Sequence, residues 1–405
     1  MALIVSQVGC ASTLTTYNAK NLMADIVAKE QTTNIALEQT DIDTVTDFSF
    51  RLFGQMVSEK KNVMVSPTSV LTAMSMTGLG AKGETKKQME QVLYGGKDIE
   101  KASNALGGWL RNLRKRTKAK FMFANSIWMK DGVVTPAKTF LQQNADYFQP
   151  EVYSAPFDSS TVTAINGWVE DKTDGMIPKI INKLKEDETM HLINAVAFQD
   201  EWKEPYEEAQ MEQGKFALAS GATADVTYLY SEEQAYLKDE QAVGVSKPYA
   251  NGFSFVALLP KEGVSLSDYV KTLDGKKFQN LLQTAQETAV DTRIPKFKSE
   301  YSSSLKQVLL KMGIEDAFDG ERADFTGIQQ KEGANLLIND VSHKTYIEVD
   351  ENGTKAAAVA NVGMTKTACA LPQEKPKVEL TRPFVYAIVD DSTGIPVFLG
   401  AVTNL

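Results

Sequence analysis

Few side chains in this 405-residue sequence could carry out catalytic or metal chemistry. It contains two histidines, His191 and His343, and two cysteines, Cys10 and Cys369. Two histidines cannot form a histidine metal cluster and leave few candidates for a catalytic base. Two cysteines near opposite ends of the sequence exclude a disulfide framework and a cysteine-rich zinc site. Because the sequence also has no Gly-rich phosphate loop and no nucleophile motif, it predicts a protein that is not an enzyme and needs no cofactor.

The segment that could instead offer a peptide bond to another protein runs from Glu351 to Pro372 and is rich in alanine. It has no helical periodicity, and a loop of this length inside a compact domain is usually functional or disordered. Every second position is small or apolar: Thr354, Ala356, Ala358, Ala360, Val362 and Met364. This alternation is typical of a strand with one buried face, so the segment could be both a loop and a strand. An alanine-rich disordered linker is the alternative.

Helices and strands are intermixed in the rest of the chain. A helix should begin at Asp43 or Thr44, and a second helix, apolar on nearly all sides and therefore central, should follow Ser66. The clearest strands, 384–389 and 397–402, flank a turn. Since strands and helices do not alternate strictly, the sequence predicts an α+β fold and one large domain over 43–405.

The start of the chain differs in composition from the rest. Residues 1–10 form a short apolar run ending in Gly9-Cys10, which is similar to the end of a lipoprotein signal peptide, although a basic beginning is missing. Residues 11–42 predict a polar tail. Lipidation of Cys10 would make the protein secreted or attached to the cell envelope rather than cytoplasmic. A disordered N-terminus with one incidental thiol is the alternative. The net charge of −9 argues against a nucleic-acid partner.

Several motifs, in order along the chain, carry a resemblance to one protein family. They are 62–69 (NVMVSPTS), 165–177 (INGWVEDKTDGMI), 194–198 with Trp202-Lys203, 294–297 (IPKF), 341–344 (VSHK), 351–358 (ENGTKAAA), 382–384 (RPF) and 397–402 (VFLGAV). From Asp43 to Leu405 the chain resembles the serpins, and we identify it as an inhibitory, bacterial member. The resemblance implies three β-sheets, eight or nine helices, a monomer, and an exposed reactive-centre loop at about 351–372.

The resemblance also implies a mechanism. A trypsin-like or elastase-like serine protease, or a cysteine protease, would cut the loop as a suicide substrate. The cut loop would then insert into the main β-sheet before the acyl-enzyme is hydrolysed. A non-inhibitory serpin acting as carrier or chaperone is the alternative. The small residues Ala356, Ala357 and Ala358 argue against it, because a hinge that never inserts would tolerate bulky side chains.

Roles for individual residues follow from the same resemblance. The hinge of the loop would comprise Glu351, Gly353, Thr354, Ala356, Ala357 and Ala358. Glu351 should pair with Lys296 close to Trp202, at the "breach" where the loop enters the sheet; the alternative is an ordinary surface ion pair. The buried "shutter" network, which must rearrange as strands part, would comprise Ser66, Ser69, Asn194 and His343. Lys355 and Ala360 depart from the family's usual glutamate and threonine, without blocking insertion.

The scissile bond has two candidate positions. Counting from Glu351 places Thr367 before the bond and Ala368 after it, which would suit elastase-like enzymes. A bond one residue earlier would follow Lys366 and suit trypsin-like enzymes. The sequence leaves both positions open.

A basic run is the last candidate site. Arg111, Arg114, Lys115, Arg116 and Lys118 lie near the end of a helix that in some serpins binds sulfated polysaccharide. The alternative is that cations simply suit a helix C-terminus.

Overall fold

The computed structural model describes residues 18–29, 37–329, 336–354 and 375–405. These residues form nine α-helices and two short 3-10 turns, Glu208–Gln210 and Asp316–Phe318. The helices are α1 (Gln39–Met56), α2 (Pro67–Gly78), α3 (Gly83–Tyr94), α4 (Ile99–Arg116), α5 (Lys138–Tyr147), α6 (Ser159–Lys172), α7 (Leu266–Lys271), α8 (Gly275–Gln283) and α9 (Lys306–Met312). In the described ranges none of them is long and apolar enough to cross a membrane.

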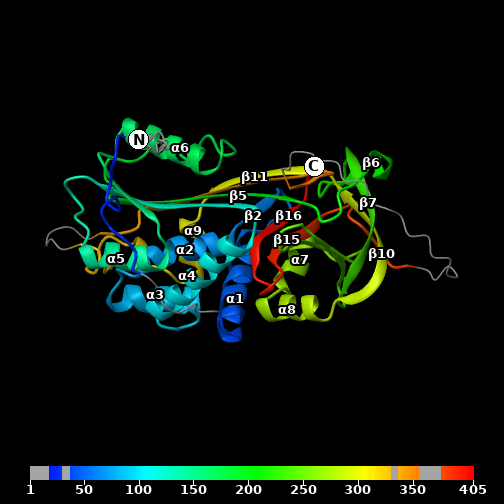
Figure 1. Cartoon of the computed structure of the whole chain (residues 1–405), viewed down its shortest axis with the longest axis horizontal. Helices are drawn as coiled ribbons and strands as arrows, with labels where there is room; N and C mark the ends of the chain where they lie inside the picture. Colours follow the sequence, from blue (N-terminus) through cyan, green and yellow to red (C-terminus); the bar gives the residue numbers. More distant parts are fainter. Residues whose placement is uncertain (1–17, 30–36, 330–335, 355–374) are drawn as a thin grey trace, which may run out of the picture.

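One sheet, which we call the main sheet, extends along the molecule and has seven strands in the order β1-β4-β3-β5-β13-β12-β11 (Figure 1). Its strands are β1 (Lys20–Asn21), β3 (Lys120–Lys130), β4 (Glu151–Ala155), β5 (Met190–Glu201), β11 (Phe297–Ser304), β12 (Asp340–Val349) and β13 (Gly353–Thr354). Two of them, β5 and β12, are parallel neighbours that also enclose β13 between them.

The second sheet has nine strands in the order β14-β10-β7-β8-β9-β15-β16-β2, with β6 paired to β7. They are β2 (Val63–Val65), β6 (Met211–Ala217), β7 (Thr223–Lys238), β8 (Ala242–Pro248), β9 (Phe253–Pro260), β10 (Gln286–Pro295), β14 (Lys377–Glu379), β15 (Phe384–Asp390) and β16 (Pro396–Val402). The resemblance implied three sheets, whereas hydrogen-bond pairing joins the described strands into two. The long β7 pairs with β6 over its first half and with β8 at its end, and so connects what would otherwise be separate sheets.

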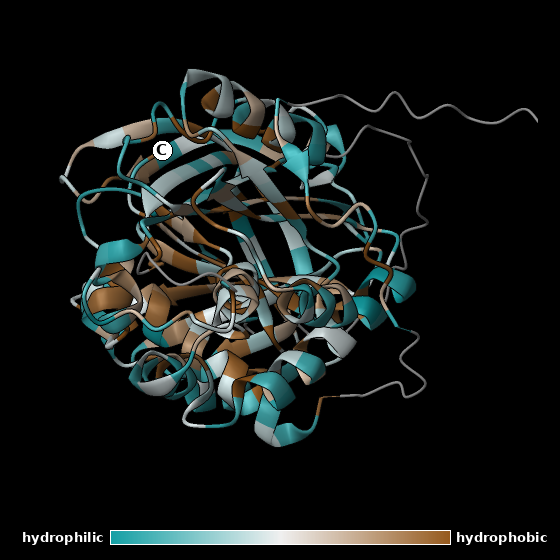
Figure 2. Ribbon diagram, turned by 90° about the vertical axis from the view of Figure 1, so that its left-hand side faces the viewer, coloured by the Kyte–Doolittle hydropathy of each residue, from teal (hydrophilic) through white to brown (hydrophobic). Residues whose placement is uncertain are grey.

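Helices cover both faces of the main sheet. In Figure 1, α6 lies on one face and α2, α4 and α5 lie on the other. Every residue of α2 is buried, as its apolar sequence predicted, and the helix packs against β3, β5 and β16. Hydrophobic segments gather between the layers and hydrophilic ones lie outside (Figure 2). The two strands predicted at the C-terminus pair with each other as β15 and β16.

Two predictions for the N-terminal part were wrong. Helix α1 begins at Gln39, with Glu38 rather than Asp43 or Thr44 at its N-cap. Asp41 sets this earlier start, because its carboxylate accepts a hydrogen bond from the Glu38 backbone N–H (3.3 Å). Lys20–Asn21, which fell in the predicted polar tail, pairs with β4 as an edge strand.

Candidate functional site at the opening between β5 and β12

Strands β5 and β12 pair directly along part of their length and then separate. Their parallel pairing runs from His191 opposite Asp340 to Ala197 opposite Tyr346. Beyond that point β13 lies between them, antiparallel to both, with Thr354 paired to Val349 on one side and to Asp200 on the other. The main sheet therefore has an open end, and the two-residue strand β13 occupies it.

The chain reaches this opening through a tight turn that requires glycine. Gly353 has a φ of 154°, and a Cβ on it would lie 2.2 Å from the backbone oxygen of Asp200. The Asp350 carboxylate fixes the turn, since Oδ1 accepts hydrogen bonds from the backbone N–H groups of Asn352 (2.8 Å) and Gly353 (3.1 Å). Burial raises the pKa of Asp350.

Trp202 holds both ends of this turn. Its indole Nε1 donates to the backbone oxygen of Asp350 (2.8 Å), and its backbone N–H donates to that of Asn352 (2.8 Å). The ring stacks on Tyr249 at a centroid distance of 4.3 Å. The Tyr249 hydroxyl lies 2.6 Å from Oγ1 of Thr354, which is fully buried. Thr354 thus points into the core, as the period-two pattern predicted.

Glu351 and Lys296 form the ion pair that the sequence predicted. The Lys296 ammonium lowers the pKa of Glu351 through a hydrogen bond. About a third of each side chain is exposed, at 29% for Glu351 and 33% for Lys296. Solvent screening limits such a pair to about 1 kcal/mol or less. Two hydrogen bonds from Trp202, one from its indole and one from its backbone N–H, also anchor the turn.

A buried ion pair beneath Trp202 was missed from the sequence. Lys247 Nζ lies 2.7 Å from Oε1 of Glu233, and both side chains are nearly inaccessible. The Lys247 ammonium also lies over the ring of Tyr206, 4.4 Å from its centroid. A signal was present, because Val245, Lys247 and Tyr249 are alternate, inward-facing positions of one hairpin.

Farther along the sheet, a buried hydrogen-bond chain crosses from β12 to β5. His343 Nε2 accepts from the backbone N–H of Ser66 (3.3 Å), so the proton of the neutral ring is on Nδ1, which donates to Oδ1 of Asn194. Asn194 Nδ2 in turn donates to Oγ of Ser69 (2.6 Å). Burial lowers the pKa of His343 to about 3, so the ring is neutral near neutral pH. The structure thus brings together all four residues predicted for the shutter.

Asn125 on β3 belongs to the same network and was missed. Its Oδ1 accepts hydrogen bonds from Ser69 Oγ (3.1 Å) and from Nδ2 of Asn194, its direct partner in the β3–β5 register. A polar residue within the apolar strand 121–129 was the available sequence signal. Ser66 contributes through its backbone, since its hydroxyl has no hydrogen-bond partner in the part of the chain described.

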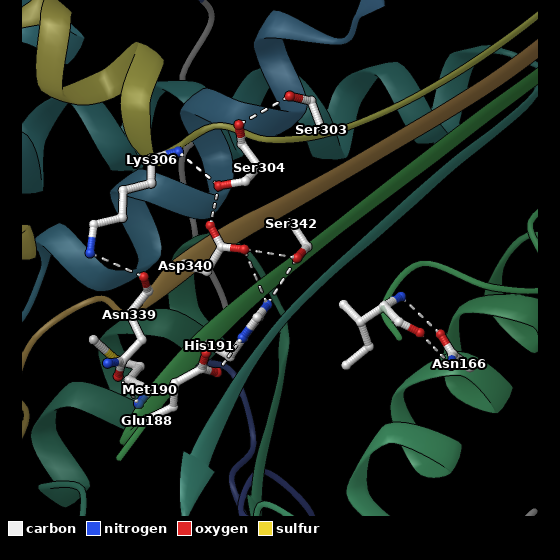
Figure 3. A network of polar contacts seen from close by, with 11 residues as sticks. Asn166, Glu188, Met190, His191, Ser303, Ser304, Lys306, Asn339, Asp340 and Ser342 are labelled. Atoms are coloured by element: carbon white, nitrogen blue, oxygen red, sulfur yellow. Dashed lines mark hydrogen bonds and ion pairs between the residues drawn. The ribbon is translucent and has the colours of Figure 1, made fainter. Parts of the chain in front are cut away.

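The other histidine crosses the same pair of strands at their far end (Figure 3). His191 Nδ1 lies 3.0 Å from Oε2 of Glu188, and Nε2 lies 2.9 Å from Oγ of Ser342 on β12. Asp340 Oδ2 is 4.0 Å from the same Nε2. Because side chains alternate along a strand, this cluster and the His343 chain lie on opposite faces of the sheet. Parting β5 from β12 would break both.

Two of the five cations in the predicted basic run are already bound within the protein. Arg116 pairs with the buried Asp390, and Arg111 donates to the backbone oxygens of Asp146 (3.2 Å) and Tyr147 (2.9 Å). Of the cations predicted to bind a polyanion, this leaves Arg114, Lys115 and Lys118. Other predicted positions lie outside the described residues: Cys10, Ala356, Ala357, Ala358, Lys366, Thr367, Ala368 and Cys369.

The family model described as serpin (serine protease inhibitor) matches residues 43–405. The native-state crystal structure of the thermophilic serpin tengpin superposes with a TM-score of 0.91 at 42% identity, covering 96% of this chain and 100% of that one. Its latent-state structure gives a TM-score of 0.80 at 41% identity, covering 94% and 100%.

Among curated proteins, the plasma serine protease inhibitor of Mus musculus is 29% identical over 88% of this chain and 89% of its own. The family match extends over nearly the whole chain, and the fold agrees with it throughout the described ranges. The chain therefore belongs to the serpin family, whose members are mostly protease inhibitors rather than enzymes.

Proposed function

We propose that this protein is a suicide-substrate inhibitor of serine endopeptidases, with cysteine endopeptidases as a second class of target. The protease would attack the reactive-centre loop and form an acyl-enzyme. The cut loop would insert into the main sheet and carry the bound protease with it. Distortion of the protease's oxyanion hole would then stop deacylation.

One observation carries this proposal: β13 already occupies the entrance between β5 and β12. In an inserted loop that continued this register, Ala356 and Ala358 would lie farther along the opening, and Ala360 would lie level with the Asn194–His343 hydrogen bond. A small residue at that level could pass between the two strands once the bond breaks.

Insertion would be favourable for two reasons. Each new backbone hydrogen bond contributes about 1 kcal/mol net, and the inserted strand would pair on both sides. The alternate apolar positions of the loop would also lose contact with water. These gains offset the cost of breaking the polar contacts between β5 and β12 at His343 and at His191. The uninserted state is therefore metastable.

Cutting after Lys366 would make trypsin-like enzymes the targets, and cutting after Thr367 would make elastase-like enzymes the targets. We also propose an extracellular or envelope location, with Cys10 as the candidate lipid-attachment residue. Mass spectrometry of the protein from its native host would detect that lipid. A sulfated-polysaccharide partner at Arg114, Lys115 and Lys118 also remains a proposal, testable by retention on a heparin column.

The test is whether a protease forms a complex that survives boiling in detergent. Thr354 is the best position to perturb, because it is buried and its Oγ1 contacts Tyr249. Thr354→Arg would place a charge in that site at a cost of several kcal/mol, while Thr354→Ser keeps the hydroxyl. We expect wild type and Thr354→Ser to form the complex, and Thr354→Arg to be cut at the same bond while releasing active protease. Cleavage without a complex in wild type, across trypsin-like, elastase-like and subtilisin-like enzymes, would favour the carrier function instead.

A further inference from the structure

One short segment holds three consecutive backbone oxygens of the turn that leads into β13. The backbone oxygen of Asp350 accepts a hydrogen bond from Trp202 Nε1 (2.8 Å), and that of Asn352 accepts one from the Trp202 backbone N–H (2.8 Å). Between them, the backbone oxygen of Glu351 accepts from the backbone N–H of Tyr206 (2.9 Å). Trp202, Tyr206 and the three residues between them directly follow β5, and we call this segment the clasp.

The clasp rests on one buried ammonium group. Lys247 Nζ lies 5.4 Å from the ring centroid of Trp202 and 4.4 Å from that of Tyr206, the first and last residues of the clasp. It also donates a hydrogen bond to the backbone oxygen of Glu204, the middle residue (3.3 Å). Aromatic faces and carbonyl oxygens both attract a cation. An apolar side chain at position 247 would therefore lose all three attractions.

Glu233 keeps this ammonium group in place. Its Oε1 lies 2.7 Å from Lys247 Nζ, and only 9% of the Glu233 side chain and 3% of the Lys247 side chain are exposed. Ser231 Oγ lies 2.6 Å from the same carboxylate oxygen and 3.3 Å from the Tyr206 hydroxyl. A buried ion pair adds little net stability compared with apolar side chains of similar volume. The contacts of this pair with the clasp therefore point to a role in positioning.

We propose that Lys247 is a positioning residue for loop insertion, which acts through the clasp on the turn at 350–352. This inference rests on the inhibitory function proposed above and deepens it. A clasp held in one place keeps Thr354 in register between Val349 and Asp200, so that insertion starts from the correct pairing. Without the ammonium group the turn would occupy several positions. Insertion would then start later, and more of the acyl-enzyme would be hydrolysed first.

The test variant combines Lys247→Met with Glu233→Gln, which removes both charges and leaves neither of them buried alone. The matched control, Lys215→Met with Asp225→Asn, removes an exposed ion pair of the same sheet. Three quantities are measured for wild type and both variants. They are hydrogen exchange at the clasp amides of the uncut protein, the rate at which trypsin and elastase cut the loop, and the number of inhibitor molecules consumed per protease molecule inhibited.

The test variant should differ from wild type in two of these quantities. The amide N–H groups of Trp202 and Tyr206 should exchange at least about fivefold faster, which corresponds to the loss of about one hydrogen bond. At least about fivefold more inhibitor should be consumed per protease molecule inhibited. The rate of cutting should stay close to that of wild type, because the scissile region is unchanged, whereas a general loss of structure would alter it as well. The control should match wild type throughout.

Unchanged exchange in a folded test variant would overturn the role of Lys247 in positioning the turn. Faster exchange with unchanged inhibitor consumption would overturn the link to insertion. If wild type itself forms no complex, the inhibitory function fails instead, and the exchange rates still decide whether Lys247 positions the turn. Should the test variant not fold, Glu233→Asp replaces it, because its shorter side chain keeps both charges and draws the ammonium group away from the clasp. Exchange at Trp202 and Tyr206 that then matches wild type would overturn the proposal.

Discussion

His343, one of two buried histidines of the main sheet, should make the protein acid-sensitive to a predictable extent. His343 is fully buried, and its pKa falls from an ordinary value of 6.5 to about 3. In the unfolded chain the ring takes up a proton as the pH falls through 6.5, while in the native state it stays neutral. His343 therefore contributes stability that is fully present above pH 6.5 and is lost as the pH decreases. At about pH 4.5, some two units below the pKa of the unfolded chain, the free energy of unfolding should have fallen by about 3 kcal/mol.

The perturbation that isolates this contribution is His343→Gln. Glutamine cannot titrate, and its amide oxygen can still accept from the backbone N–H of Ser66. The assay is unfolding in urea, followed by tryptophan fluorescence, at about pH 7 and about pH 4.5. The variant should be less stable than wild type at neutral pH, because Asn194 loses a partner at a cost of about 1–3 kcal/mol. Between the two pH values, however, it should lose about 3 kcal/mol less than wild type does.

His191→Gln is the matched control, since it removes the other histidine and leaves His343 in place. The reasoning is refuted if wild type and His343→Gln lose the same stability on acidification. Such a result would mean that the native ring of His343 takes up its proton as readily as the unfolded one.

Three further predictions concern the hinge, the buried network and the scissile bond. Gly353→Ala should displace β13 and lower the free energy of unfolding in urea by at least about 1 kcal/mol, because the new Cβ would overlap the Asp200 backbone oxygen. Gly320→Ala is the control and should have little effect, because no atom lies within 4 Å of its new Cβ. Asn125→Ala should lower stability by about 1–3 kcal/mol, because the Ser69 hydroxyl loses its acceptor and Asn194 loses one of two. The exposed Asn280→Ala should change stability little, and equal effects of the two substitutions would exclude Asn125 from the network. Lys366→Ala should abolish inhibition of trypsin-like proteases and leave inhibition of elastase-like proteases largely intact, as measured by residual protease activity. Loss of both inhibitory activities, or of neither, would mean that the scissile bond is misplaced.

Much of the fold was predictable from local sequence. The all-round apolar run after Ser66 indicated a buried helix, and the turn 390–394 between two apolar runs indicated the β15–β16 hairpin. The start of α1 was not predictable from local sequence. The Asp41 carboxylate extends the helix beyond the polar residues Asp43 and Thr44 that looked like its cap.

The residues of the site were also only partly predictable from the sequence. Family motifs predicted the Glu351–Lys296 pair and the four shutter residues. Asn125 and Tyr249 were missed because their partners lie far away in sequence, 69 residues away for Asn125 and Asn194 and 105 for Tyr249 and Thr354. Only the strand register brings them together. The partner of Arg116 in the basic run was not predictable for the same reason, since Asp390, which binds Arg116, lies 274 residues away.

The central claim is that the main sheet can accept one more strand. The most direct measurement is the melting temperature of the protein before and after a single cut near Lys366-Thr367. If the freed segment from Thr354 to Met364 enters between β5 and β12, it adds a row of backbone hydrogen bonds, each contributing about 1 kcal/mol net. The cleaved protein should therefore melt far above the intact one. A cleaved protein that melts at or below the temperature of the intact protein would contradict the claim.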